Sequence, residues 1–352
     1  MSDPRKLDSI EAFRPREAAD FTEVALTRKA EILLEAFHGR MPTGSELLNI
    51  SEELGVELAT AVYIRALQES NTHGSLIRKL RAFELNKWSR SAAGDLEVAV
   101  VASNFFHSGR RWGDHVEPWR NWARELGFKT ASIDTDPQLS VAANARVILE
   151  FLRNDPDTPR LIVSYGQGSA EMRYLLQRRV KELENVRGWI SVCGACDGLT
   201  SSQIFLEDNL PNLFLRLRMK LAGRNPITLT ETSPDFPFWQ NPMPVPKGMA
   251  VISIVGVPYR WQVAKRLRRL YDRLSVKGPN DGLVSIFEAA AYPSLIVPLG
   301  GLDHRASDIV LEPVLKRLFA VLAIEHCQVK KVEPEKEKGP GSNPGLFELI
   351  CS

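Results

Sequence analysis

The feature that most constrains the fold is an alternation of short apolar runs with amphipathic stretches from residue 96 onward. The runs at 96–102, 161–163 and 189–192 are rich in Val, Ile and Leu at successive positions. Such continuous runs are typical of strands that are buried on both faces. Further runs of this kind lie at 249–257 and 295–299, and residues 129–133 form a short, more polar candidate strand. Strands that alternate with helical patterns predict an α/β fold, in which helices cover a mostly parallel sheet.

Segments of different composition flank and interrupt this predicted core, which spans residues 96–326. Residues 1–95 show helical periodicity, and we expect a helical appendage that serves as a scaffold or as a surface for a protein partner. Residues 199–247 are apolar, aromatic and Pro-rich, which indicates an insertion that is either a lid or an extra packed helix pair. The tail, residues 327–352, is charged and rich in Pro and Gly, so we expect it to be disordered.

Composition excludes several classes of protein. Lys and Arg total 45 against 43 Asp and Glu, and this balance argues against a nucleic-acid partner. No apolar run reaches the length that a membrane-spanning helix needs, and the N-terminus has no apolar signal core. Four cysteines are too few for a disulfide scaffold. Together these features predict a soluble, cytoplasmic protein.

The stretch LIVSYGQGSAE at 161–171 combines the end of a strand, a tight turn with glycines and the start of a helix. This is the setting of a nucleophile elbow, which usually reads G-x-S-x-G. With the strand ending at residue 163, Ser164 stands at the first Gly of the pattern and Gly168 at the last. Gly166 then occupies the nucleophile position, so the turn is present but the expected serine is not.

Two further loops supply the partners that a nucleophile would need. Asp281 lies in GPNDGL, after the run at 249–257, and His304 ends GGLDH, after the run at 295–299. The order of nucleophile turn, acid and histidine is that of one hydrolase fold and differs from two others. In such a set the imidazole takes the proton of the nucleophile, and the carboxylate orients the imidazole and stabilises its charged form.

Residues 96–310 therefore resemble the α/β-hydrolase superfamily, the fold of many esterases, lipases and thioesterases. In particular, they resemble uncharacterised bacterial members whose turn reads S-x-S-K before a helix. The resemblance rests on VSYGQGSAE, WISVCGACDG, GPNDGL and GLDH. It implies that Asp281 is the acid and His304 the base, and that the ligand is a small acyl or ester compound. It also implies an oxyanion hole built from the backbone N–H of Gln167 and a second one near Asn104 or Phe105.

Gly166 departs from this pattern, and three explanations compete. In the first explanation, the serine was lost naturally, which leaves a pseudoenzyme that binds a ligand or a protein. Alternatively, the glycine was introduced to silence an enzyme. Otherwise another residue attacks, and Ser164 is the best candidate because Ser164-Tyr165-Gly166 also reads S-x-G. The sequence therefore leaves open whether the chain is an active enzyme.

Other chemistries find less support in the sequence. Cys193 and Cys196 form a C-x-x-C pair after a strand, as in redox motifs, but the surrounding pattern is not that of a short thioredoxin-like domain. The sequence holds no second C-x-x-C and no H-x-x-x-H, so we expect no metal site. Gly166 and Gly168 begin a weak G-x-G-x-x-G pattern, but Glu171 at its last position would repel a pyrophosphate. We therefore expect no cofactor.

Overall fold

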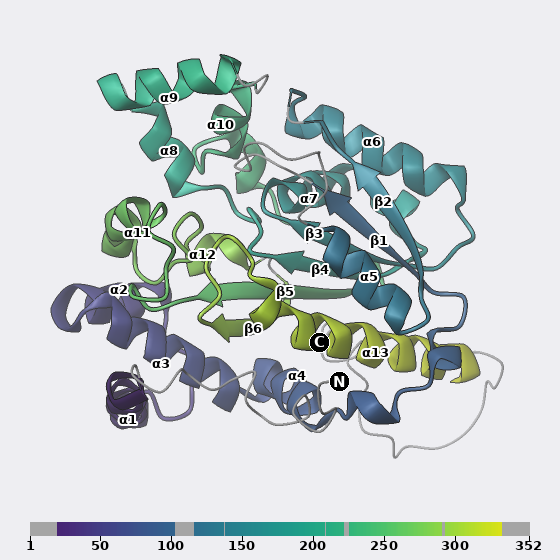
Figure 1. Cartoon of the computed structure of the whole chain (residues 1–352), viewed down its shortest axis with the longest axis horizontal. Coiled ribbons are helices and arrows are strands. Elements are labelled where there is room, and N and C mark those ends of the chain that lie inside the picture. The colour runs from purple at the N-terminus through teal and green to yellow at the C-terminus, as the bar shows by residue number, and fades with distance from the viewer. Residues whose placement is uncertain are drawn as a thin grey trace, which may run out of the picture.

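The computed structural model describes residues 20–102, 116–136, 138–207, 209–221, 225–290 and 293–332 (Figure 1). Within these residues a single six-stranded sheet has the order β2-β1-β3-β4-β5-β6, and all its neighbouring strands are parallel. The strands are β1 Glu97–Ala102, β2 Lys129–Asp134, β3 Arg160–Tyr165, β4 Val186–Val192, β5 Ala250–Val257 and β6 Leu295–Gly300. The prediction of an α/β fold with a mostly parallel sheet is confirmed.

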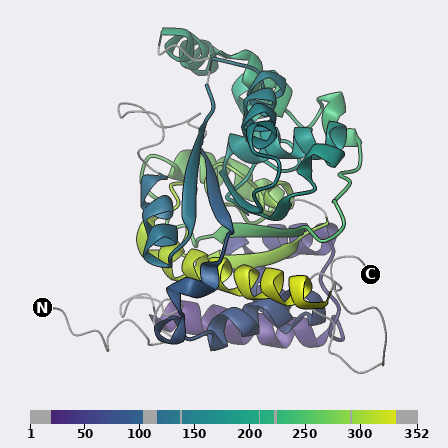
Figure 2. The same ribbon diagram turned by 90° about the vertical axis from the view of Figure 1, so that its right-hand side faces the viewer.

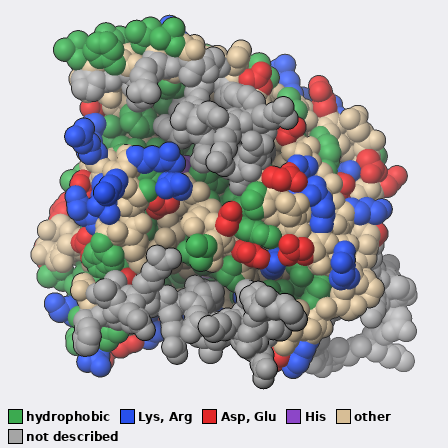
Figure 3. Space-filling model, viewed as in Figure 1, with side chains coloured by type: hydrophobic (Ala, Val, Ile, Leu, Met, Phe, Trp, Pro, Cys, Tyr) green, Lys and Arg blue, Asp and Glu red, His purple; other side chains and the backbone are tan. Residues whose placement is uncertain are grey.

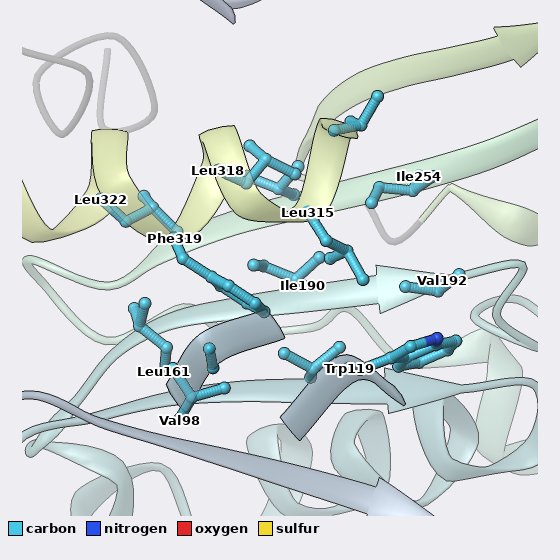
Figure 4. Close-up of a cluster of buried hydrophobic side chains, with 14 of the residues drawn as sticks. Val98, Trp119, Leu161, Ile190, Val192, Ile254, Leu315, Leu318, Phe319 and Leu322 are labelled. Atoms are coloured by element: carbon cyan, nitrogen blue, oxygen red, sulfur yellow. The ribbon is translucent and has the colours of Figure 1, made fainter. Parts of the chain in front are cut away.

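Helices cover both faces of the sheet, as the view in Figure 2 shows. On one face, α5 (Glu117–Glu125) and α13 (Asp308–Val332) pack on alternate strand residues, in a cluster that includes Trp119 and Phe319 (Figure 4). On the other face, α6 (Val141–Asn154) and α7 (Gln167–Arg178) pack on the intervening strand residues. Because both faces are covered, β3 and β5 are buried along their whole length, which explains their continuous apolar sequence.

Four N-terminal helices cover the edge of the sheet at β6. They are α1 Asp20–Glu35, α2 Gly44–Leu54, α3 Val56–Glu69 and α4 Asn71–Ala82, followed by the short turns η3 Leu85–Lys87 and η4 Arg90–Ala93. The backbone N–H of Ile296 on this edge strand donates to Nδ1 of His73 on α4, at 3.1 Å. The helices therefore satisfy an edge group that would otherwise face solvent or another chain. A role for this segment in binding a protein partner stays a prediction.

The connection between β4 and β5 contains α8 (Thr200–Leu206), α9 (Leu210–Leu221), α10 (Ile227–Thr232) and η6 (Pro237–Gln240). Buried Arg173 on α7 anchors it, because its guanidinium pairs with Asp197 and donates to the backbone oxygens of Trp239 and Asn241. Arg173 therefore ties both the beginning and the end of the connection to the middle of α7. Its action as a lid stays a prediction.

Three short helices come between β5 and β6 in the chain: α11 (Arg268–Leu274), η7 (Ser275–Lys277) and α12 (Ile286–Ala289). A further short helix, η5 (Val180–Leu183), precedes β4. Helix α13 runs to Val332, past residue 326 where the sequence analysis ended the core, and residues 333–352 lie outside the described part. No helix among the described residues is long and apolar enough to cross a membrane.

Candidate active site at the carboxyl edge of the sheet

The strand-to-helix turn expected from the sequence is present between β3 and α7. Strand β3 ends at Tyr165, α7 begins at Gln167, and Gly166 alone makes the turn with φ +53° and ψ −118°. A positive φ is a conformation that glycine adopts readily and that other residues adopt under strain. Gly166 therefore lies at the position, and in the strained backbone region, where an elbow would hold its nucleophile.

Backbone hydrogen bonds to the end of β4 and to the following loop hold this turn in place. The N–H of Gly166 donates to the carbonyl of Val192 at 3.2 Å, and the carbonyl of Gly166 accepts from the N–H of Ala195 at 2.9 Å. The loop approaches so closely because residue 194 is glycine. A Cβ at Gly194 would lie 2.0 Å from the hydroxyl oxygen of Ser191, closer than any real contact.

Asp281 and His304 meet beside the turn. Oδ2 of Asp281 lies 2.9 Å from Nδ1 of His304, and both residues are buried. The second carboxylate oxygen, Oδ1, accepts from the N–H groups of Leu283 and Val284, at 2.9 and 2.7 Å. The loops are also joined through their backbones, because the N–H of His304 donates to the carbonyl of Asp281 at 2.8 Å. The carboxylate thus fixes the imidazole so that Nε2 is the free ring nitrogen, as a triad requires.

Tyr165, which the sequence did not single out, contacts His304 through both its hydroxyl and its ring. Its hydroxyl donates to the backbone oxygen of His304, and its ring lies 5.4 Å from the imidazole, centroid to centroid. The ring of Trp119 packs edge-on against Tyr165 from α5. Tyr165 is the last residue of β3, next to Gly166. The turn and the histidine loop are therefore tied together at a single strand end.

The free nitrogen of His304 faces the nucleophile position. A Cβ built on Gly166 would lie 3.8 Å from Nε2 of His304, with no closer neighbour. For a serine, a C–O bond of about 1.4 Å and an O···N hydrogen bond of about 2.8 Å, meeting at about 120°, place Cβ about 3.7 Å from the nitrogen. The space and the distance at Gly166 thus match those of a serine that is hydrogen-bonded to its base.

Ser164, the alternative nucleophile, is not brought to His304. Its hydroxyl has no exposed surface, accepts from the indole N–H of Trp189 at 2.8 Å, and lies 2.8 Å from the hydroxyl of Ser169. Ser191 continues this chain of hydroxyls by donating to Ser169 at 2.8 Å. Adjacent strand residues point to opposite faces, so Ser164 lies among the residues below α7, whereas Tyr165 faces the histidine.

The expected oxyanion hole is described in part. Gln167 is the first residue of α7, so its N–H has no partner within the helix and lies at the positive end of the helix dipole. The side chain of Gln167 donates to Oε1 of Glu171 at 3.2 Å, and Asn144 donates to the same oxygen at 3.0 Å. Asn104 and Phe105, the expected source of the second donor, lie outside the described residues.

The two cysteines of the C-x-x-C pair are free thiols in the buried loop after β4. Burial, followed by the charge of Asp281, raises the pKa of Cys193 well above its ordinary value. Burial also raises the pKa of Cys196 to about 11. Reactive cysteines have a lowered pKa, so these thiols lack the activation that redox chemistry needs. Among the described residues, no group of three or more His, Cys, Asp or Glu side chains is placed to hold a metal ion.

Comparisons with known proteins bear on the fold. Neither a protein-family model nor a curated protein sequence matches the chain. Among solved structures, a metagenomic carboxyl esterase, MGS0156, matches with a TM-score of 0.50 and 17% identity over 68% of this chain and 77% of that one. The lipase BlEst2 of Bacillus licheniformis matches in its propeptide form, with a TM-score of 0.50 and 17% identity over 65% of this chain and 50% of that one. At these identities the likeness concerns the fold, and it agrees with the parallel sheet and the turn described above: the chain has the α/β-hydrolase fold.

Proposed function

We propose that this protein belongs to the lineage of ester and thioester hydrolases, binds a small acyl or ester ligand, and is catalytically impaired in this form because Gly166 stands at the nucleophile position. The observation that carries the proposal is the match between the 3.8 Å from the Gly166 Cβ position to His304 and the distance that a serine needs. Asp281 and His304 keep the hydrogen bond of a working acid–base pair.

In such a site, His304 would take the proton of a hydroxyl at position 166 while the oxygen of that hydroxyl attacks the acyl carbon. The proton would then pass to the leaving alcohol or thiol, and water would release the acyl group in a second step. The N–H of Gln167 would donate to the oxyanion that forms in both steps. Gly166 has no side chain to supply the hydroxyl, so no acyl-enzyme can form at this position.

Two alternatives keep the same fold. In the first, the chain is a non-catalytic binding or scaffolding protein, whose ligand or partner does not use His304. In the second, it is an active hydrolase with Ser164 as nucleophile. The hydrogen bonds of Ser164 to Trp189 and Ser169 and its complete burial weigh against the second alternative.

The decisive experiment uses a fluorophosphonate probe, which labels activated serines, with the labelled residue mapped by mass spectrometry. It compares the chain as it stands, Gly166→Ser, and Gly166→Ser combined with His304→Ala or with Asp281→Asn. The matched control is Gly166→Ala, which adds the same Cβ in the same strained conformation without a hydroxyl. Circular dichroism and thermal melts establish that each variant is folded.

We expect no labelling of the unaltered chain or of Gly166→Ala, and labelling at position 166 in Gly166→Ser. Removing His304 should abolish that label, and Asp281→Asn should slow it by on the order of 10⁴-fold, because the imidazole loses its orienting partner. Labelling of the unaltered chain at Ser164 would establish the active-hydrolase alternative. A folded but unlabelled Gly166→Ser variant would contradict the proposal and favour the binding protein.

A further inference from the structure

Helix α9 exposes an unusually apolar surface, which we call its outer face. The five side chains of this face are large and between 51% and 80% exposed: Leu210, Leu213, Phe214, Leu217 and Leu221. Their spacing of three or four residues places them along one side of the helix. Figure 3 shows hydrophobic side chains gathered over α9 at the upper left of the molecule. An exposed patch of this kind marks a surface that binds something else.

The side of α9 that faces the protein is more polar than the outer face. Asn212 is buried there, and its amide donates to the backbone oxygens of Ile204 and Glu207, at 2.6 and 3.1 Å. Arg216 donates to the backbone oxygen of Leu206 at 3.1 Å. Polar contacts to the end of α8 and the buried side chain of Met219 thus hold the helix, while its large exposed apolar side chains lie on the outer face. The protein core does not use the outer face.

Positive charge accompanies the outer face. Lys220, in the second half of helix α9, is exposed. Helix α11 packs against α8, and Arg273 of α11 pairs with Glu207, just before α9, at 3.0 Å. Lys and Arg side chains gather on the face below α9 (Figure 3). Between residues 260 and 273, Arg260 pairs with Asp272 and Arg273 with Glu207, and three more cations are exposed: Lys265, Arg266 and Arg269.

The size of the outer face argues against a second copy of the chain as its partner. A helix of this length extends about 18 Å and is about 10 Å wide. Two such faces would bury on the order of 400 Å² in total, well below the roughly 1,200 Å² of a stable interface. A row of leucines with a phenylalanine, accompanied by Lys and Arg, is the composition of helices that lie in the interface of an anionic bilayer.

We propose that the outer face of α9 docks on an anionic lipid surface, with the helix lying in the plane of the interface. The apolar side chains enter the boundary between headgroups and acyl chains, and the neighbouring cations contact the anionic headgroups. Helix α9 belongs to the β4–β5 connection, whose first residues lie beside Gly166 of the candidate site. The inference does not depend on whether that site is catalytic.

The test is co-sedimentation of the full chain with vesicles of phosphatidylcholine, with or without 30% phosphatidylserine. The apolar contacts are removed by Phe214→Ser with Leu217→Ser, both at exposed positions, so that folding is not at risk. The matched control is Ile32→Ser with Ile309→Ser, at positions of α1 and α13 that are 67% and 76% exposed. The charge contribution is tested by Lys220→Glu with Arg269→Glu. Phe214→Trp supplies a fluorescence signal from the outer face.

We expect binding to the vesicles that contain phosphatidylserine, and a blue shift of the Phe214→Trp emission when they are added. The α9 double variant should bind at least tenfold more weakly, since two large apolar anchors are lost, while the control pair binds as the unaltered chain does. Charge reversal should also weaken binding about tenfold. The proposal is overturned if the unaltered chain does not bind vesicles, or if the control pair loses as much as the α9 pair. It is equally overturned if sedimentation velocity shows a lipid-free dimer that the α9 pair dissolves, because the outer face would then join two copies.

Discussion

Replacing Glu171 by glutamine should remove a large part of the pH dependence of stability. Glu171 lies in α7, one turn after Gly166, and has no exposed surface. Burial raises its pKa to about 8 and outweighs the hydrogen bonds from Asn144, Gln167 and Thr135, which lower it. In the folded protein this carboxyl is therefore mostly protonated at neutral pH, whereas in the unfolded chain it ionises near pH 4.5.

The sign of the effect follows from this difference. Between pH 4.5 and about 8, the folded state keeps a proton that the unfolded state has released. The free energy of unfolding must then fall as the pH rises, by about 1.4 kcal/mol per pH unit from this one group. The contribution is fully present below pH 4.5, and about 2–3 kcal/mol of it is lost between pH 5 and pH 7. Glutamine has nearly the shape of a protonated glutamate but no proton to lose in this pH range, so Glu171→Gln should not show this loss of stability.

The measurement is urea unfolding at pH 5, 6, 7 and 8 for the unaltered chain, Glu171→Gln, and a surface control, Glu150→Gln. Other titrating groups contribute equally to all three proteins, so the difference between two curves isolates the substituted carboxyl. The free energy of unfolding of Glu171→Gln should rise relative to that of the unaltered chain by more than about 1 kcal/mol per pH unit. The curve of the Glu150→Gln control should run parallel to that of the unaltered chain. If the curves of Glu171→Gln and the unaltered chain are parallel over this range, the carboxyl is not held protonated and the reasoning fails.

Two other predictions concern the packing behind the turn. Gly194→Ala should lower the free energy of unfolding by about 1–3 kcal/mol, because its methyl group would overlap the buried hydroxyl of Ser191. The control is Gly300→Ala, where a Cβ meets no atom within 4 Å. It should change the free energy of unfolding by less than about 0.5 kcal/mol in the same urea titration. Ser164→Ala should cost about 1–3 kcal/mol, since the buried indole N–H of Trp189 loses its acceptor, yet it should leave probe labelling of the Gly166→Ser variant unchanged. Loss of that label on a folded Ser164→Ala background would return Ser164 to the list of nucleophiles.

The strands and the turn could be predicted from the sequence because their signals are local. A strand buried on both faces needs a continuous apolar run, and the run at 161–163 lies within β3. Asp281 and His304 could be expected near each other because both follow strands of one parallel sheet, whose carboxyl ends share an edge. The sequence also placed Gly166 at the turn, where the structure shows its positive φ.

The contacts that complete the site could not be predicted, because they join residues far apart in the chain. The hydroxyl of Tyr165 reaches the backbone of His304 across 139 positions, and only the placement of two loops decides that contact. Ser169 and Ser191 meet because of the register between neighbouring elements, which no local pattern encodes. The apolar spacing of α9 is visible in the sequence, but it does not tell which side of the helix the protein leaves uncovered.

The arrangement of the site explains why its geometry does not depend on the residue at position 166. Asp281 is held by two backbone N–H groups, His304 by Asp281 and Tyr165, and the turn by backbone hydrogen bonds to β4 and the loop after it. None of these contacts involves a side chain at 166. Glycine also relieves the strain of about 1–3 kcal/mol that a serine would carry at this φ. A glycine at position 166 therefore leaves the Asp281–His304 pair in place and lowers the strain at the turn. An ordered pair is thus compatible with the absence of a nucleophile, and the reactivity of a hydroxyl introduced at position 166 tests whether the pair can activate one.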